Sequence, residues 1–462
     1  MTFRDQRAIL TMLVCLAPLA CAQDQSAKDA ASVPDPPKAE RWNLYYQATS
    51  IGMYHGTFTS PYSGPLSLRD YPERDVSLTT TLFFGLNLGA NTQFYFNPEI
   101  AGGRGFSMVD GMANASNGEL PRVATATPKP YIARLFVTHD FGFGDAVENV
   151  ESDANQLAGT RPENRYTVTI GRFTVTDYFD NNRYSHDPRE QFMGWAVMYN
   201  GAWDYPADVR GYTWGWVHEL HRKNWSLRYA SAMEAKVANG SQFDRRVLRD
   251  RGDMFEGEYR WEANKHAGAV RLLASQQHSD SGDYARALAL AAGTHTTPSV
   301  VATRQPGTTK YGFGVSADQE IAKDVGVFGR LGWNNGKTES FAFTAVDHLA
   351  TIGVSVNGSR WKRPHDTVAS EVTVSGLSQV HAQYLAAGGL DFLIGDGALR
   401  YGPETVWESY YSARVFPGFT TSVDYQHAVN PAYNRDRGPV NIFALRLHLE
   451  MSKDTFLHKA KP

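Results

Sequence analysis

Several polar residues alternate with apolar ones in a pattern that would gather them on one face of a β-strand. Tyr95, Asn97 and Glu99 stand two positions apart, and residues spaced by two share a face of a strand. Three other alternating segments carry polar candidates of the same kind, namely Arg134, Arg165 and Glu219. Carboxylate and guanidinium groups form strong hydrogen bonds with hydroxyl groups, and the arginine fork can hold two oxygens. These residue types are therefore suited to binding the hydroxyl groups of a small molecule.

A second set of polar candidates lies in segments rich in turn-forming residues. It comprises Arg104, Asp177, Asp180, Asn181, Arg183, Asp187, Arg189, Asp204 and Asp208. Such side chains can contact a ligand, but Asp and Asn in loops also commonly cap turns by hydrogen-bonding to the backbone. Asp177, Asp180 and Asp187 could supply the paired carboxylates that hydrolyse glycosidic bonds. Any Asp-rich loop would look the same, so this pattern alone does not indicate an enzyme.

Other patterns typical of catalytic or metal sites are incomplete. In the segment His218-Glu219-Leu220-His221 the second histidine comes one residue too soon for the helical zinc motif H-E-x-x-H. The sequence has no G-x-S-x-G nucleophile motif, and its 14 histidines show no tight metal-ligand spacing. The glycines of residues 102–105 are more typical of a turn than of a phosphate-binding loop. We therefore predict no catalysis, no metal and no cofactor.

The elements that must position these residues are β-strands. After Trp42 no run of 18 apolar residues occurs, and many segments of about ten residues alternate between apolar and polar positions. In the last one, Phe443, Leu445 and Leu447 share one face. About seventeen candidate strands begin near residues 42, 76, 91, 131, 165, 192, 211, 224, 253, 266, 309, 324, 346, 368, 403, 418 and 439.

The alternation alone fits either a soluble β-sandwich or a membrane β-barrel. The segments are long for a sandwich, whose strands usually have five or six residues. Aromatic residues also cluster near segment ends, as at Trp42, Trp195, Trp203, Trp214 and Trp407, which is typical of side chains at a lipid interface. Bacterial single-chain barrels have an even number of strands. We therefore predict an all-β, transmembrane antiparallel β-barrel of about 16 strands, with 18 as the alternative.

The predicted loops of this barrel are long. Five stretches qualify, at residues 101–130, 142–164, 174–191, 276–308 and 376–402, and some of them could fold into the barrel. Residues 283–292 could form a short helix. The net charge of −3 gives no sign of a nucleic-acid partner. With 12% aromatic and 20% charged residues, the chain also does not resemble a disordered or coiled-coil protein.

The first residues are typical of an export signal. Arg4 and Arg7 precede an apolar run, and Ala20-Cys21-Ala22 fits a small-x-small cleavage site. Both cysteines, Cys15 and Cys21, lie in this segment, so cleavage after Ala22 would leave a chain without cysteine. We expect a signal peptide at residues 1–22, a flexible segment at 23–41, the barrel at 42–451 and a short tail at 452–462.

Several stretches resemble the OprB family of carbohydrate-selective porins of bacterial outer membranes. The densest match spans Val175 to Gly211 and contains FDNN, HDPR and DYPADVRG. In a second, NPAYNRDRGPV leads into FALRLHLE (Tyr425 to Glu450). Shorter matches are FTSPYSGPLSL (58–68), YFNPEIAGGRG (95–105), ESDANQLAG (151–159), RLGWNNGKTESFAFT (330–344) and AAGGLDFLIGDG (386–397). A basic tail after the last strand departs from the usual terminal aromatic of barrel proteins.

The resemblance implies an outer-membrane channel through which glucose-like monosaccharides and small oligosaccharides diffuse. Sugars would then be the solutes, and outer-membrane lipid, lipopolysaccharide and the barrel-insertion machinery the other partners. Passage of a neutral sugar requires polar groups that replace its hydration and flat apolar surfaces for its C–H faces, and Tyr95 and Tyr410 are candidates for stacking. The alternatives are a soluble periplasmic glycan-binding β-sandwich, or a barrel of another class such as a hydrolase or receptor.

Overall fold

The structure is a computed structural model that describes residues 37–89, 91–120 and 127–453. The expected signal peptide at residues 1–22, most of the expected flexible segment at 23–41 and most of the expected tail at 452–462 lie outside the described residues.

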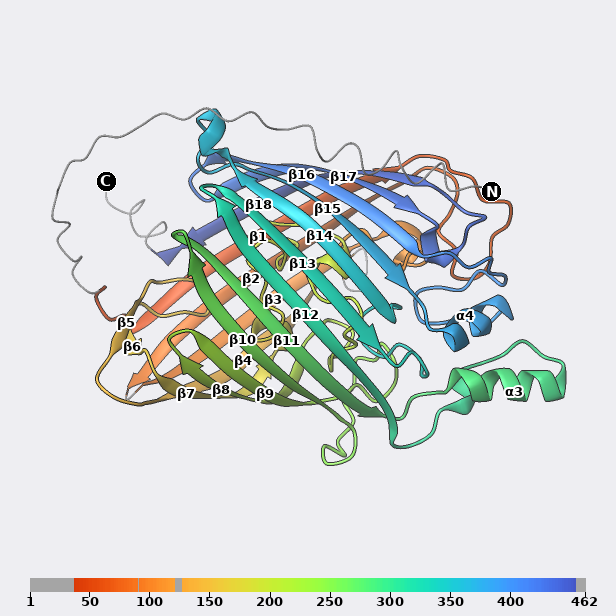
Figure 1. Ribbon diagram of the computed structural model, residues 1–462, viewed down its shortest axis with the longest axis horizontal. Helices are drawn as coiled ribbons and strands as arrows, with labels where there is room; N and C mark the ends of the chain where they lie inside the picture. Colours follow the sequence, from red (N-terminus) through yellow and green to blue (C-terminus); the bar gives the residue numbers. More distant parts are fainter. Residues whose placement is uncertain (1–36, 90, 121–126, 454–462) are drawn as a thin grey trace. The chain divides into compact units, whose positions relative to one another are not determined.

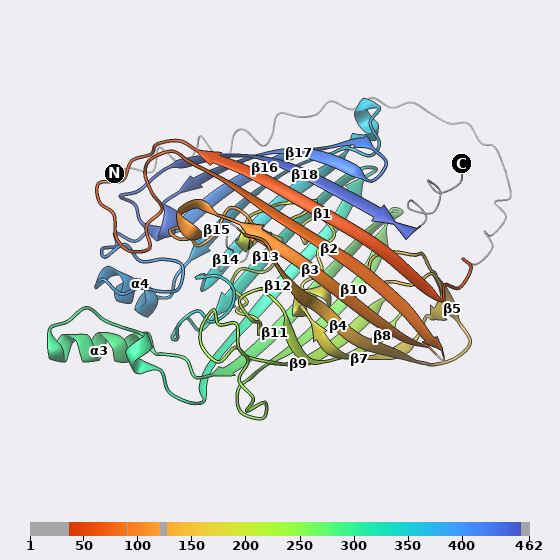
Figure 2. The ribbon, with the colours of Figure 1, turned by 180° about the vertical axis from the view of Figure 1, so that it is seen from behind.

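In the described residues, sixteen antiparallel strands form one closed barrel (Figures 1 and 2). They are β1 (Trp42–His55), β2 (Glu73–Gly89), β3 (Thr92–Gly103), β4 (Lys129–Gly142), β7 (Arg165–Phe173), β8 (Thr213–Arg222), β9 (Trp225–Met233), β10 (Arg251–Ala263), β11 (His266–Ser279), β12 (Thr308–Ala322), β13 (Val325–Asn334), β14 (His348–Asn357), β15 (Thr367–Gly376), β16 (Glu404–Phe416), β17 (Phe419–Val429) and β18 (Val440–Ser452). Pairing of β1 with β18 closes the barrel. The predicted sixteen-stranded antiparallel barrel is confirmed.

The alternation of each strand separates an apolar outer face from a polar inner one. On β18, Phe443 and Leu445 are 52% and 49% exposed, whereas Arg446 and His448, which follow them on the other face, are 1% and 2% exposed. An apolar residue that stays exposed on a closed barrel faces the hydrocarbon of a bilayer, and the charged residues face the interior. Among the described residues, no helix combines the length and the apolar character needed to span a membrane.

The two ends of the barrel differ in the length of their connections. At one end the strands are joined mainly by two-residue turns, such as 223–224 between β8 and β9 and 264–265 between β10 and β11. At the other end the connections are long, as at 56–72, 174–212, 234–250, 280–307, 335–347 and 377–403. In outer-membrane barrels the short turns face the periplasm and the long loops face the exterior, and we name the two ends accordingly.

Short elements lie in the connections. A small two-stranded sheet, β5 (Val147–Val150) with β6 (Gly159–Pro162), lies between β4 and β7 at the periplasmic end. The helices are α2 (Trp195–Met198), α3 (Tyr284–Thr294) and α4 (Gln379–Ala386), with 3-10 turns η1 (Phe106–Met108), η2 (Val175–Asp177), η3 (Val301–Thr303), η4 (Gly358–Trp361) and η5 (Pro431–Tyr433). The helix predicted at 283–292 is thus confirmed as α3, which begins after Asp283, whose side chain accepts a hydrogen bond from the Arg286 N–H.

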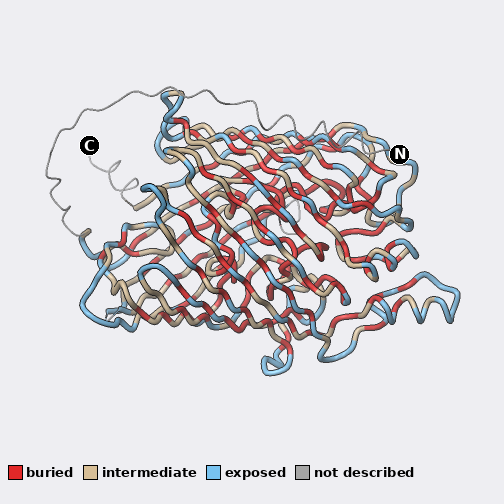
Figure 3. Tube along the Cα trace, in the orientation of Figure 1, coloured by how far each residue is buried: buried red, intermediate tan, exposed pale blue. Residues whose placement is uncertain are grey.

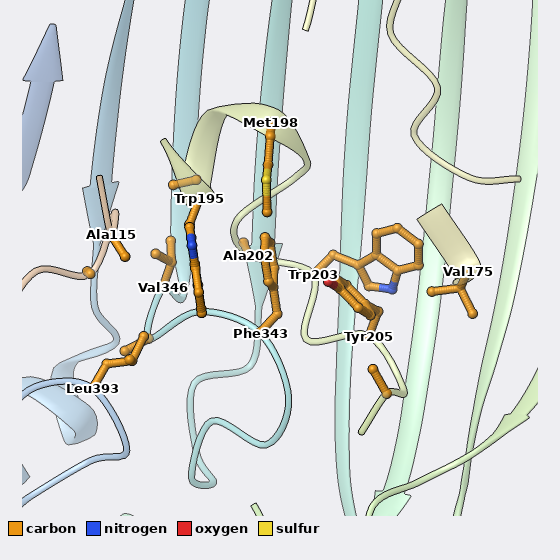
Figure 4. Packing of buried hydrophobic residues seen from close by; sticks show 14 of the residues in the cluster. Ala115, Val175, Trp195, Met198, Ala202, Trp203, Tyr205, Phe343, Val346 and Leu393 are labelled. Atoms are coloured by element: carbon orange, nitrogen blue, oxygen red, sulfur yellow. The ribbon is translucent and has the colours of Figure 1, made fainter. Parts of the chain in front are cut away.

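The barrel interior holds a hydrophobic core made by infolded loops. Figure 3 shows buried segments running through the interior as well as along the wall. Trp195, Trp203, Tyr205 and Phe343 belong to this core (Figure 4). The strand predicted near residue 192 is therefore wrong, because this segment is part of the loop between β7 and β8 and contains α2. Trp195 and Trp203 pack within the protein rather than at a lipid interface.

A buried histidine joins three of the external loops. His381 at the start of α4 places Nδ1 3.0 Å from Asp347 Oδ2 and Nε2 3.1 Å from Asp391 Oδ2. The Tyr284 ring of α3 stacks on the imidazole with centroids 4.2 Å apart, and its hydroxyl donates to Asp391 at 3.0 Å. Burial alone would lower the pKa of His381, but Asp347 and Asp391 raise it to about 9. The histidine is therefore a cation that ties the loops of α3 and α4 to the loop before β14.

We expect this tie to weaken in alkali. The pKa of His381 is about 6.5 in the unfolded chain and about 9 in the folded one. The positive charge of His381 therefore stabilises the docked loops fully below pH 6.5, and this stabilisation is lost as the pH rises through 9. A spin label at exposed Leu290 on α3 (L290C) should become more mobile between pH 7 and pH 10. H381Q should give the mobile spectrum at both pH values, whereas H427Q, which alters a histidine on β17, should behave as the wild type. Equal pH dependence in H381Q and the parent would contradict the assignment.

Candidate functional site

The loop between β7 and β8 (residues 174–212) folds into the barrel and is fixed to the wall by two buried arginines. Arg330 of β13 donates from Nη1 to the Ser185 hydroxyl at 3.0 Å and to the Val197 carbonyl at 2.6 Å, and its Nε lies 2.9 Å from Asp180 Oδ2. Arg446 of β18 donates to the carbonyl oxygens of Pro188, Gln191 and Glu190 at 2.6–3.0 Å. Arginine suits this role because its fork supplies several donors in one plane.

Carboxylates of the wall hold the same loop from other sides. Glu408 of β16 accepts hydrogen bonds from the backbone N–H groups of Met193 and Gly194 at 2.5 and 3.0 Å. Glu256 of β10 accepts one from the Asp180 N–H at 2.7 Å. Side chains of the wall thus replace the secondary-structure partners that an irregular buried backbone lacks.

Glycines on the wall make room for the loop. A Cβ atom at Gly326 would overlap the ring of Tyr184, and one at Gly332 would overlap the side chain of Asn200. Both glycines lie on β13, the strand that also carries Arg330. The close approach of loop and wall at this strand therefore requires glycine for steric reasons.

The infolded loop leaves a cavity against the wall formed by β2, β3 and β4. It contains about 940 Å³ of empty space, part of it continuous with open solvent. One group of lining residues is charged or polar: Glu99, Glu119, Tyr131, Arg134, Asp177, Asp187, Arg189 and Arg210. A second group is aromatic: Trp195, Tyr199, Tyr205, Tyr212 and Phe343.

Arg189 is at the centre of the polar group. Its guanidinium donates to Glu119 at 2.8 Å, to Gln47 at 2.7 Å and to Glu99 at 3.2 Å. Burial raises the pKa of the Glu119 carboxyl, and Arg189 offsets this only in part. Burial would also raise the pKa of Asp187, but Arg189 outweighs it and holds that pKa below its ordinary value. One arginine therefore compensates the charge of several carboxylates around the cavity.

Arg134 and Asp177 form the second charged contact. Nε and Nη2 of Arg134 donate to the two carboxylate oxygens of Asp177 at 2.7 and 2.6 Å, which is a bidentate pair. The Arg134 guanidinium also lies over the Tyr212 ring, 5.4 Å from its centroid. Its Nη1 atom makes no hydrogen bond to the part of the chain that the structure describes. This Nη1 atom is itself buried, so Arg134 meets the cavity through the rest of its side chain.

The aromatic side consists of rings from two loops. Trp195 stacks on Phe343 with ring planes 9° apart and centroids 5.8 Å apart, and Tyr205 lies 4.8 Å from Phe343 (Figure 4). Tyr199 lies 6.1 Å from the same ring. These rings offer flat apolar surface in the same cavity as the charged groups.

Of the sequence-predicted residues, five line this cavity: Glu99, Arg134, Asp177, Asp187 and Arg189. Tyr95 and Asn97 point inward from β3 as predicted, but the segment between β4 and β7 covers them. The Tyr95 hydroxyl lies 3.3 Å from the Leu157 N–H that donates to it, and Asn97 donates to Asn155 at 2.9 Å. These two residues are therefore not at the cavity.

The other predicted residues are distributed along the barrel. Arg165 lies 2.9 Å from Glu148 of the small sheet between β4 and β7, and Glu219 lies 3.1 Å from Arg228 within the wall. Asp180 contacts Arg330, and Asp204 accepts hydrogen bonds from the backbone N–H groups of residues 341–343. Arg104 and Asn181 are exposed loop residues.

Sequence reasoning missed Tyr131, Tyr212 and Glu119. Tyr131 and Arg134 on β4 both line the cavity although they are three positions apart. The pairing of β3 with β4 explains this, because a β-bulge shifts the register where Pro98 lies opposite β4, and a bulge changes which residues face inward. Proline within a strand signals such an irregularity, so Pro98 was the available indication.

Comparison with known proteins agrees with this architecture. The sequence model of the carbohydrate-selective porin, OprB family, matches residues 76–451. The chain belongs to the OprB family of carbohydrate-selective porins. It is therefore an outer-membrane channel for carbohydrates, as the resemblance in the sequence implied, and the comparison does not favour a soluble sandwich or a barrel of another class.

One solved structure shows the same fold, and a second matches less closely. The porin resembles a high-pH structure of Pseudomonas putida OprB with a TM-score of 0.67 and 15% identity, over 89% of this chain and 94% of that one. A Salmonella typhi OmpF complex with daunomycin matches with a TM-score of 0.48 and 9% identity, over 89% of this chain and 97% of that one. The porin has no match among curated proteins.

Proposed function

We propose that sugars cross the barrel through the cavity beside the infolded loop, and that this cavity selects them. Glu99, Arg134, Asp177 and Arg189 would replace part of the hydration of the sugar hydroxyls. Tyr199, Tyr205 and Phe343 would contact the C–H faces of the ring. Monosaccharides and small oligosaccharides would pass passively down their gradient, since weak contacts spread along a path allow release.

One observation carries this proposal: charged groups and flat aromatic rings line the same cavity. A pyranose ring has hydroxyl groups around its edge and C–H groups on its faces, so it matches such a surface better than an ion or an aliphatic solute does.

The remaining predicted residues receive supporting roles in the proposal. We assign Asp180 and Asp204 to holding the infolded loops, and Arg165 and Glu219, with Tyr95 and Asn97, to the inner surface on the periplasmic side. Arg104 and Asn181 would contact solutes only outside the cavity. Transport would involve no catalysis and no cofactor.

We also propose the route by which the chain reaches its membrane. Residues 1–22 would act as a cleaved signal peptide, and residues 23–41 would form a flexible segment before the barrel. The barrel-insertion machinery would fold the barrel at 42–451 into a bilayer that contains lipopolysaccharide. N-terminal sequencing of the protein extracted from outer membranes tests this, because Gln23 should be its first residue.

Proteoliposome swelling tests the selective cavity. In R134Q the bidentate pair with Asp177 and the positive charge beside the cavity are both lost, so swelling in glucose relative to a neutral amino acid of similar size should fall several-fold. R271Q is the matched control, because Arg271 is a buried inward arginine that pairs with Asp318 at 2.7 Å and does not line the cavity. An unchanged glucose preference in R134Q, or an equal loss in R271Q, would remove Arg134 from the selective site.

A further inference from the structure

A second group of titratable residues lies inside the barrel, away from the proposed sugar cavity. Glu190 of the infolded loop meets His448 and Glu450 of β18, and the ligand atoms of the three side chains all lie within 4.8 Å of one another. His448 and Glu450 are two positions apart, so both face the interior from one strand. About 258 residues separate them from Glu190 in the sequence, which is why histidine spacing gave no sign of this group.

The imidazole of His448 is directed into the group. Its side chain is 97% buried, and Nε2 lies 3.6 Å from Glu190 Oε1 and 3.4 Å from Glu450 Oε1. These distances are too long for hydrogen bonds, and Nε2 has no hydrogen-bond partner among the described residues. Burying a polar atom without a partner costs free energy. The group therefore lacks a partner for His448 Nε2.

The separations match the coordination shell of a metal ion. Around an ion with metal–ligand bonds of 2.0–2.2 Å, the edges of a tetrahedron measure about 3.3–3.6 Å. The two measured separations from Nε2 fall in this range. One imidazole nitrogen with two carboxylate oxygens suits zinc and similar transition metals, whereas Mg²⁺ and Ca²⁺ prefer oxygen alone.

The surroundings hold the three side chains in position. Nδ1 of His448 lies 2.8 Å from the Thr49 hydroxyl, which can accept its proton and leave Nε2 free for an ion. The backbone of Glu190 is fixed by Arg446 at 3.0 Å, and Gln47 donates to Glu450 at 3.3 Å. The carboxylates of Glu190 and Glu450 are each about half exposed, and Glu190 borders a second cavity of about 1080 Å³. An ion could therefore enter from solvent.

We propose that Glu190, His448 and Glu450 bind a divalent transition-metal ion, with Zn²⁺ as the best-suited ion. Three protein ligands leave a fourth position for water or a solute oxygen. The ion would join the infolded loop to β18 and would neutralise two carboxylates in the interior. None of the three ligands lines the sugar cavity, and Gln47 contacts both Arg189 and Glu450. Zn²⁺ binding can be tested whether or not that cavity selects sugars.

Titration calorimetry of the tag-free, metal-stripped full chain in detergent tests the site, with ZnCl₂ as the probe. The wild type should bind one Zn²⁺ ion, and H448Q should weaken binding by more than tenfold. T49V removes only the hydrogen bond to Nδ1 and should weaken binding about 10–100-fold while retaining every ligand. The matched control is H266Q, because His266 lies 3.2 Å from Glu320 in another histidine–glutamate pair and should not affect binding.

Two further measurements keep the test decisive if a variant is poorly folded. Co²⁺ in the wild type should give the intense visible bands of a four-coordinate site, and E190Q should lose them while circular dichroism shows an intact barrel. Excess Mg²⁺ should not displace Zn²⁺. The proposal is overturned if the wild type binds no Zn²⁺, if H448Q binds it as the wild type does, or if Mg²⁺ competes equally.

Discussion

Replacing Arg330 with methionine is expected to raise the single-channel conductance several-fold and to abolish the preference for sugars. Arg330 is fully buried and joins β13 to Asp180, Ser185 and Val197 of the infolded loop. Breaking a buried ion pair by removing one partner costs about 3–5 kcal/mol, because the other charge is left uncompensated. The loop should therefore leave the wall near Arg330 and widen the channel. Planar-bilayer recording, with swelling in sugars of increasing size, measures both effects.

A control and a second variant separate loosening of the loop from general damage to the barrel. R271M removes another buried inward arginine, but its partners Asp318 and Glu258 belong to the wall, so the conductance should stay near that of the wild type. Adding D180N to R330M removes the uncompensated carboxylate and should recover part of the thermal stability. If R330M and R271M change conductance alike, Arg330 does not hold the constriction.

The barrel itself could be predicted because lipid and water impose a strict alternation on every strand. On β18 the outward residues Phe443 and Leu445 and the inward residue Arg446 follow that alternation without interruption. The even strand number of such barrels reduced the count of about seventeen candidate strands to 16 or 18, and the structure has sixteen. The prediction of a strand near residue 192 is wrong because this segment does not lie between lipid and water. Phe192 and Met193 are both fully buried by protein. Alternation carries no information where both faces of a segment meet protein.

The site was predictable only in part, because its residues gain their roles from how the loop folds back. Asp177 and Asp180 lie three positions apart in one loop, yet Asp177 pairs with Arg134 at the cavity and Asp180 pairs with Arg330 in the wall contact. Residue type and local spacing are the same for both roles. Tyr131 was not predicted because the bulge beside Pro98 changes which residues of β4 face inward. Glu119 was not predicted because its arginine partner lies 70 residues further along the sequence.

The second large effect is expected for E99Q, which should shift the ion preference of the channel toward anions. Glu99 is 3% exposed and accepts hydrogen bonds from Thr81 at 2.5 Å and Tyr212 at 3.2 Å, besides its contact with Arg189. Glutamine offers one acceptor oxygen and directs an NH₂ donor toward these donors. The cavity thus loses one negative charge while Arg189 and Arg134 stay charged. The reversal potential across a KCl gradient measures the shift.

The position of the lost charge, rather than its loss alone, should decide the size of this shift. E258Q removes one inward carboxylate whose partners Arg228 and Arg271 lie in the wall outside the cavity. Charges in a narrow, poorly hydrated passage act on passing ions far more strongly than charges facing open water. E258Q should therefore move the reversal potential much less than E99Q does. Equal shifts of the reversal potential in E99Q and E258Q would mean that the narrowest part of the channel does not lie at Glu99. The sugar cavity would then not be the constriction of the channel.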